Sequence, residues 1–277
     1  MTLSLRKSLL ELPEYREVLL TLVARDLKVK YQTKALGFAW SLLYPAVMIG
    51  IWYTVFRTII KIEMPRYWAF LICGMLPFQF VQNAIMSGSG AVRCNAGLVR
   101  KVYMPMEVLV IAAVTVKLVE FLLQLAVAIV LLAILHRGEQ IHFSYIKTIL
   151  VLPPAVGLLY LFVLGVSLPL AAWSVIYRDL EHMIGLALMA LMYLTPVFWS
   201  LTFVTNMSWR KWFVLNPVTD FIELLRGPLY WGTWPANTAI GGGALNAWAV
   251  ACFFAVAAFV IGYELFDRSK HVLAEVV

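Results

Sequence analysis

The chain has 277 residues, of which 62% are hydrophobic and 13% are charged, and its mean hydropathy is +0.86. Soluble globular domains are about half apolar and about one quarter charged, so this composition excludes an ordinary water-soluble domain and indicates an integral membrane protein. The formal net charge of +7 comes mostly from residues outside the apolar runs, where lipid headgroups and membrane topology explain it better than nucleic acid does.

The N-terminal segment precedes any long apolar run, and residues 14–35 predict an amphipathic helix. Its apolar side chains recur at helical spacing between Tyr15 and Val23, whereas Arg25 and Lys28 lie on the opposite face. A basic amphipathic helix that leads directly into a membrane span is expected to lie in the membrane interface. The alternative is a positively flanked start to a membrane anchor.

Six apolar runs follow, each long enough for a helix of roughly 20 residues that crosses a bilayer. We expect these spans at 36–60, 68–90, 107–135, 145–173, 183–205 and 245–266. The predicted fold is therefore an all-α integral membrane protein with six transmembrane helices. Its domains are a cytoplasmic segment with the interface helix at 1–35, a transmembrane domain at 36–266 and a cytoplasmic tail at 267–277.

The distribution of lysine and arginine predicts the orientation of the spans. These residues are concentrated before the first span, and the connection after it carries fewer of them. Positive residues favour the cytoplasmic side of a membrane, so the N-terminus is placed in the cytoplasm. Six spans return the C-terminus to the same side.

Lys117 and Glu120 lie in the middle of the third expected span, three residues apart and therefore on one helix face. A lone charge at the centre of a span costs about 2.5–3.5 kcal/mol on insertion scales, so a pair of intramembrane charges is a candidate functional site. The alternative is that the two charges only neutralise each other against the protein interior.

Aromatic residues are dense in the first two expected spans. Many are expected to anchor the helices at the headgroup level or to pack in the interior. The others would line a path for sugars, because the apolar CH faces of a sugar pack on aromatic rings. The candidates for this path are Trp40, Tyr44, Trp52, Tyr53 and Phe56.

The long connection 206–244, expected on the external side, contains signals for a short capped helix. Asn216-Pro217 supplies an N-cap followed by proline at the first helical position, and Gly227-Pro228 supplies a stop. The apolar residues between them form one face, while Glu223 and Arg226 are polar. This pattern predicts short re-entrant external helices between spans five and six.

The sequence lacks the common motifs of catalytic and nucleotide-binding sites. No phosphate loop of the form GxxxxGK[ST] occurs, so ATP is not expected to bind in that way. No HExxH, GxSxG or paired-acid site stands out. The four histidines are dispersed and Cys73, Cys94 and Cys252 are scattered, so we expect no metal site, no disulfide framework and no catalytic residue.

A set of short motifs runs through nearly the whole chain in a fixed order. The motifs lie at 25–31, 36–40, 44–45, 73–78, 95–105, 177–179 and 216–226. They include RDLKVKY, LGFAW, CGMLPF and NAGLVRKVYMP. As an ordered set they resemble the permeases of type-2 ABC exporters for polysaccharides, in particular those that export O-antigen, teichoic acid or related lipid-linked glycans.

The resemblance implies a division of labour between subunits. Two copies of the permease would form the pathway across a bacterial cytoplasmic (inner) membrane, and two separate ATP-binding-cassette subunits would drive transport from the cytoplasm. The substrate would be a lipid-linked polysaccharide of the O-antigen, teichoic acid or capsule type. This chain would hold no cofactor of its own, because ATP and magnesium would bind to the partner subunit.

The resemblance also implies roles for individual residues. The interface helix would control the access of the lipid-linked substrate, through Arg25, Lys28, Lys30 and Tyr31. A coupling helix at 95–104 would dock on the ATPase, with a smaller second contact before the fifth span; the residues are Asn95, Gly97, Leu98, Arg100, Lys101, Arg178 and Asp179. The external helix would act as a gate, through Asn216, Glu223 and Arg226. Lys117 and Glu120 match none of these motifs.

Two other functions are consistent with the sequence. A type-2 ABC permease for a lipid or a drug would share the fold, and a closed, narrow cleft in place of a wide aromatic channel would favour it. A membrane-embedded transferase acting on polyprenyl-linked sugars would need acidic or histidine residues that converge at a membrane surface. Glu120 and Asp179 are the only suggestive residues for that chemistry.

Overall fold

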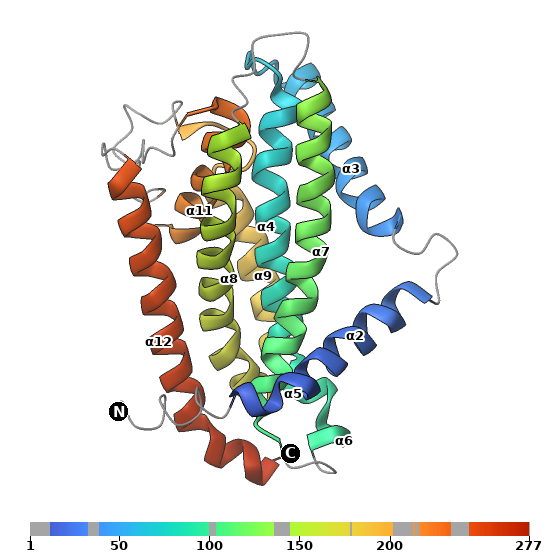
Figure 1. Ribbon diagram of the computed structural model, residues 1–277, viewed down its shortest axis with the longest axis vertical. Coiled ribbons are helices and arrows are strands. Elements are labelled where there is room, and N and C mark those ends of the chain that lie inside the picture. The colour runs from blue at the N-terminus through green and yellow to red at the C-terminus, as the bar shows by residue number, and fades with distance from the viewer. Residues whose placement is uncertain are drawn as a thin grey trace.

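The computed structural model describes residues 12–32, 39–99, 104–135, 145–177, 179–201, 213, 216–233 and 244–276. Every regular element in these ranges is a helix, which confirms the predicted all-α fold (Figure 1). The elements are η1 (Leu12–Tyr15), α2 (Arg16–Gln32), α3 (Ala39–Tyr53), η2 (Thr54–Ile59), α4 (Tyr67–Ser89), α5 (Ala91–Cys94), α6 (Ala96–Val99), α7 (Met106–Leu135), α8 (Tyr145–Ile176), α9 (Leu180–Leu194), α11 (Pro217–Arg226), η5 (Gly227–Trp231) and α12 (Ala244–Val276).

Five helices in the described part of the chain are long and apolar enough to cross a membrane. They cover Ala39–Ile59, Tyr67–Ser89, Met106–Ile134, Tyr145–Ile176 and Asn246–Ser269, close to five of the six expected spans. The fifth expected span, at 183–205, corresponds to α9. Its 15 residues rise only about 22 Å, less than the hydrocarbon core of about 30 Å.

The end of α9 has a local cause. Thr195 is extended, with φ −105° and ψ 141°, and it immediately precedes Pro196. The proline ring disfavours the α conformation of the residue before it, so the helix ends at Leu194 and not at 205 as expected. Residues 202–205 lie outside the described part of the chain.

The last expected span, at 245–266, lies within α12 (Ala244–Val276). The residues expected to form the cytoplasmic tail, 267–277, follow it directly. In the structure α12 continues without interruption to Val276. Arg268 pairs with Glu264 one turn earlier, at 2.5 Å, which supports the helix beyond the expected boundary.

Helix α4 lies at the centre of the bundle and packs against α3, α7, α8, α9 and α11 (Figure 1). In the most apolar 18-residue stretch of α4, 78% of the residues are buried. In the corresponding stretch of Ala39–Ile59, which contains α3, only 6% are buried. Helices α12, α8, α4 and α7 run side by side along the long axis of the molecule. The core is therefore built around α4, and α3 is attached to its edge.

Two glycines allow α8 and α12 to cross closely. A Cβ atom at Gly262 would collide with the backbone of Gly165, and a Cβ atom at Gly165 would collide with the backbone of Ala258 and Phe259. Small residues at helix crossings in membranes let the two backbones approach, because lipid provides no hydrophobic force between helices. This crossing holds the C-terminal helix against the bundle.

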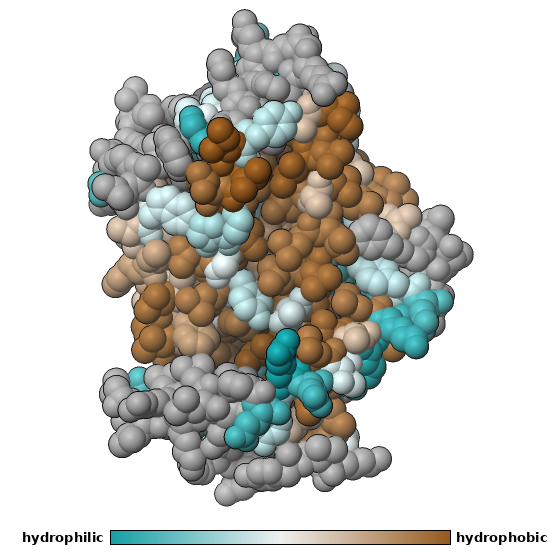
Figure 2. Space-filling model, in the orientation of Figure 1, coloured by the Kyte–Doolittle hydropathy of each residue, from teal (hydrophilic) through white to brown (hydrophobic). Residues whose placement is uncertain are grey.

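The outer surface fits a bilayer environment. Figure 2 shows apolar residues covering the middle of the visible face and hydrophilic residues gathered toward the end that carries α2. Ile149, Leu186 and Phe253 are among the exposed large side chains, at 71%, 71% and 68%. Helices α2, α5 and α6 and the end of α12 lie at one end, whereas α11 and η5 lie in the opposite half (Figure 1).

Candidate functional site

The predicted interface helix is α2, and it packs against α7. Leu22 and Val23 are buried in this contact, as their place on the predicted apolar face suggests. Leu20 and Val29 are 53% and 62% exposed and point away from the bundle core. A helix with apolar residues both toward the protein and away from it suits the boundary between the bundle and lipid.

The intramembrane charges of α7 have a partner on α2. Lys30 Nζ lies 2.6 Å from Glu120 Oε1, and Lys117 Nζ lies 3.6 Å from Glu120 Oε2. Two ammonium groups therefore flank one carboxylate. Tyr31 lies beside this cluster, where burial and then the charge of Glu120 raise the pKa of its phenol. The sequence predicts the pair within α7 but not the cation that α2 brings to it.

A cavity of about 540 Å³ adjoins this charge cluster, between α2, α3, α4 and α7. The side chain of Gln124 closes one wall by donating a hydrogen bond from Nε2 to the Ser41 carbonyl, at 2.8 Å. The cavity is polar and aromatic, with two of the aromatic residues predicted for the glycan path in its lining. The lining residues are Lys30, Trp40, Ser41, Tyr44, Pro45, Gln79, Asn83, Glu120 and Gln124.

The other three aromatic residues predicted for that path lie further along the chain, at the C-terminal end of α3 and in η2. Trp52 and Phe56 pack on Phe198, with ring centroids 4.5 Å and 5.3 Å away. Tyr53 stacks on Tyr67 at 6.4 Å. The five predicted residues thus divide into a pair at the polar cavity and a cluster that joins α3 to the turn after α9.

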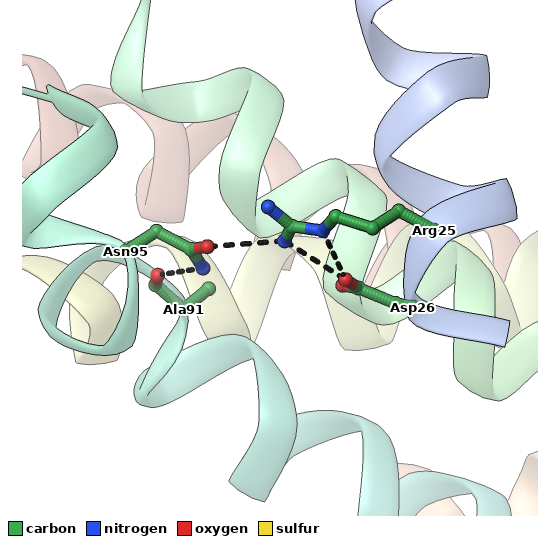
Figure 3. A network of polar contacts seen from close by, with 4 residues as sticks. All are labelled: Arg25, Asp26, Ala91 and Asn95. Carbon is green, nitrogen blue, oxygen red and sulfur yellow. Dashed lines mark hydrogen bonds and ion pairs between the residues drawn. The ribbon is translucent and has the colours of Figure 1, made fainter. Parts of the chain in front are cut away.

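The predicted ATPase-coupling segment, 95–104, begins directly after α5 and includes α6. Asn95 lies between them and accepts a hydrogen bond from Arg25 Nη2 of α2 at 3.2 Å (Figure 3). Its Nδ2 donates to the Ala91 carbonyl at 2.9 Å, and Arg25 also pairs with Asp26 at 2.8 Å. Helix α2 and the start of the predicted coupling segment, 70 residues apart in sequence, are therefore directly connected.

A second contact joins α5, directly before the predicted coupling segment, to α9. Arg93 Nη2 of α5 forms an ion pair with Glu181 Oε2, in the first turn of α9. Asp179 stands directly before that helix. Sequence reasoning missed Arg93 and Glu181, although opposite charges beside two segments expected at the same membrane surface were a usable signal.

The remaining predicted coupling residues differ in their surroundings. Leu98 is half-buried against the core, whereas a Cβ atom at Gly97 would meet no heavy atom within 4 Å. Gly97 therefore offers an open surface on the coupling segment. Arg100, Lys101 and Arg178 lie outside the described residues.

Helix α11 begins as its sequence predicts. The side chain of Asn216 accepts a hydrogen bond from the Val218 backbone N–H at 3.1 Å, and Pro217 occupies the first turn. The α-helix ends at Arg226, before the predicted Gly227 stop, and continues as the wider helix η5. The element is buried on nearly every side, because it packs against α4, α8 and α12.

The two charged residues predicted for the external gate form a pair inside the protein. Arg226 is fully buried and lies 2.5 Å from Glu223 Oε1. It also donates hydrogen bonds to the Pro196 carbonyl at 3.0 Å and to the Val197 carbonyl at 3.4 Å. Its guanidinium lies 3.8 Å from the ring centre of Phe70 on α4. Arg226 thus fixes α11 to the central helix and to the turn after α9.

Comparison with known proteins identifies the family of this chain. The O-antigen export system permease protein RfbA of Myxococcus xanthus is 30% identical over 222 residues, which cover 79% of this chain and 83% of that protein. RfbA of Klebsiella pneumoniae is 26% identical over 264 residues, or 94% and 95% of the two chains. The polysialic acid transport protein KpsM of Escherichia coli is 25% identical over 212 residues, or 74% and 78%. Residues 17–230 match the ABC-2 type transporter family, and the chain is a multi-pass membrane protein that belongs to it.

Proposed function

We propose that this protein is the transmembrane subunit of an ATP-driven exporter, which moves a lipid-linked polysaccharide across the cytoplasmic (inner) membrane of a bacterium. The observation that carries the proposal is the similarity to O-antigen export permeases over 94% of this chain and 95% of the relative. The polysaccharide would be of the O-antigen, teichoic acid or capsule type, and both termini of the chain would lie in the cytoplasm.

Membership of the ABC-2 family implies an ABC transporter system with an ATPase partner. We propose that two copies of this chain assemble with two ATP-binding-cassette subunits, which bind ATP and magnesium and hydrolyse the nucleotide. The chain itself would supply the pathway, with no cofactor. Its sequence contains no phosphate loop of its own, which agrees with this division.

The polar contacts at the α2 end suggest how force would pass from the ATPase into the membrane. The ATPase would dock on α5, α6 and the following residues, where Gly97 is open. A displacement of this segment would reach α2 through the Arg25–Asn95 hydrogen bond and α9 through the Arg93–Glu181 ion pair. Short helices held by such contacts move as rigid bodies and transmit a push without bending.

The cavity beside α2 and the buried helix α11 suit the two ends of a transport path. Trp40 and Tyr44 line the cavity and are 48% and 56% exposed, so their rings are open to contact with a sugar. Helix α11 would close the external end, where Arg226 and Glu223 hold it against α4. An external gate must be closed at rest, and a buried ion pair gives a discrete closed position.

The proposal is tested in cells that lack the chromosomal copy of the chain. Surface polysaccharide should disappear from the cell exterior, lipid-linked polysaccharide should accumulate inside, and a plasmid copy should restore export. In the same assay Gly97→Leu should lower export, because it places a bulky side chain on the proposed docking surface. Gly157→Leu is the matched control, since Gly157 is also open but lies on α8, outside that surface.

Two results of this experiment would contradict the proposal. One is normal surface polysaccharide in the deletion strain, together with a lipid or a drug that this strain no longer exports. The other is equal loss of export in the two glycine variants at equal amounts of protein in the membrane, which would remove any special role of the coupling segment.

A further inference from the structure

Glu120 lies between two lysines that belong to different helices. Lys30, on α2, donates a hydrogen bond to one of its carboxylate oxygens at 2.6 Å. Lys117, on α7 itself, lies 3.6 Å from the other oxygen, which is longer than a hydrogen bond. Glu120 therefore binds Lys30 directly, and Lys117 stands beside the pair as a second cation.

Helix α2 is held to the bundle by few buried side chains. Of its 17 residues, Leu22 and Val23 are buried. Leu20, on the same helix, is 53% exposed. An element with little buried apolar surface separates from the rest of a protein at a low free energy. The contact between Lys30 and Glu120 is therefore important for keeping α2 against α7.

Separation of α2 from α7 would remove Lys30 from Glu120. The Glu120 side chain is only 9% exposed and lies in the middle of a membrane helix. Breaking a buried ion pair by removing one partner is strongly unfavourable, because the remaining charge has no compensation. Lys117 avoids this cost, since it lies one turn before Glu120 on the same helix and stays with it when α2 moves.

We propose that Lys117 is the replacement counter-ion of Glu120, and that it makes the contact between Lys30 and Glu120 a releasable latch of α2. With α2 in place, Glu120 binds Lys30. With α2 displaced, Lys117 closes the gap of 3.6 Å and neutralises the carboxylate alone. Each position of α2 has its own paired arrangement, as an element with two discrete states requires.

The latch deepens the proposed function and rests on it, because α2 is the helix to which substrate access is assigned. Lys30 and Glu120 both line the polar cavity, so release of the latch would open that cavity toward α2. The two charges of α7 that match none of the sequence motifs thereby have a role in positioning α2.

The two lysines should act in opposite directions, although the loss of either removes one positive charge. Lys30→Met removes the latch and leaves Glu120 paired with Lys117, so α2 should separate from α7 more often. Lys117→Met keeps the latch and removes the replacement, so separation would leave Glu120 unpaired and should become rarer. A cluster that only neutralises charge predicts the same direction for both variants.

The test measures how often α2 separates, from the rate at which a small thiol reagent labels a buried position of α2. Val23→Cys is introduced into the full-length protein in membranes, together with Cys94→Ser and Cys252→Ser because those two cysteines are exposed. Lys30→Met should raise the labelling rate at position 23 about tenfold and Lys117→Met should lower it about tenfold, a factor that corresponds to about 1.4 kcal/mol. Lys117→Arg retains the charge and should restore the original rate.

Two controls separate the latch from general effects on the protein. Leu20→Cys replaces a side chain that is already exposed, so its labelling should not respond to either lysine variant. Arg16→Gln removes an exposed charge near the start of α2 and should leave the labelling rate at position 23 unchanged.

The proposal is overturned if both lysine variants change the labelling rate in the same direction, or if Lys30→Met does not raise it. Lys30→Met is the safer variant for folding, because Glu120 keeps Lys117 as its partner. Labelling requires no transport, so its result does not depend on which substrate the protein exports. A failure of the latch is therefore distinguishable from a failure of the proposed function, which the export assay detects.

Discussion

Arg226 is a fully buried cation in a protein whose charged residues are otherwise mostly at the surface. A buried charge is tolerated when it is paired and hydrogen-bonded, and Arg226 has a carboxylate, two carbonyls and an aromatic face around it. The planar guanidinium meets these partners at once, which an ammonium group does not reproduce. At the scale of single residues this contact is the strongest determinant of where α11 lies.

The space for Arg226 depends on Gly74. A Cβ atom at Gly74 would collide with the guanidinium of Arg226 and would come within 2.9 Å of the Val197 carbonyl oxygen. Gly74→Ala should therefore displace the guanidinium and destabilise the protein by about 1–3 kcal/mol, as overpacking in a core does. The measurement is the thermal unfolding midpoint of the purified protein in detergent.

Gly157→Ala is the control for this prediction, because a Cβ atom at Gly157 meets nothing within 4 Å. Alanine has a higher helix propensity than glycine by about 1 kcal/mol, so this variant should be unchanged or slightly more stable. Equal unfolding midpoints for the two alanine variants would show that Arg226 is not confined as the structure indicates.

Local signals predicted several elements correctly. The Asn216 cap and the proline after it define the start of α11, and the apolar periodicity places α2 against the bundle. The end of α9 was not predicted, because the apolar run continues past Pro196 while the backbone does not remain helical. Hydropathy reports lipid compatibility, and it does not report the conformation that a proline forces on the residue before it.

Contacts between distant segments account for most of what the sequence left open. The spacing of Lys117 and Glu120 indicates a pair on one helix, but nothing in it points to Lys30, 90 residues away. Likewise, no sequence pattern indicates that Arg25 contacts Asn95 or that Arg226 is buried. Periodicity identifies faces of helices, whereas the choice of partner is set by the packing of the whole bundle.

The connection between α2 and the coupling segment gives a prediction at the scale of elements. Arg25 and Asp26 are exposed or partly exposed, so these polar contacts contribute little to stability. Asn95→Ala should therefore leave the unfolding midpoint and ATPase binding nearly unchanged. It should lower the amount of polysaccharide exported per ATP hydrolysed, because the coupling segment would move without α2.

Arg16→Gln tests whether any loss of charge on α2 has the same effect. Arg16 is exposed on the same helix, and its substitution should preserve the ratio of export to hydrolysis. Arg25→Gln should lower the ratio of export to hydrolysis as Asn95→Ala does. The double variant Arg25→Gln/Asn95→Ala should lower this ratio no further than either single variant. Additive losses would mean that the two residues act independently.

At the scale of the whole molecule, the fold places three features along its long axis. The α2 end holds the contacts between α2, α5 and α9, and the polar cavity lies between α2, α3, α4 and α7. The opposite half holds α11, fixed by Arg226 against the central helix α4. Composition and motif order predict a multi-pass permease of this family, whereas the division into these regions follows only from the packed structure.

In the proposed exporter this chain carries a lipid-linked polysaccharide, and a separate ATPase supplies the energy. The most direct test reconstitutes the chain with its ATPase subunit in vesicles that contain the lipid-linked polysaccharide, and it measures glycan that becomes accessible on the far side. Transfer should require ATP, magnesium and both subunits, and should fall when Gly97 is replaced by leucine. A chain that binds no ATPase, or transfer that proceeds equally well without ATP, would contradict the account.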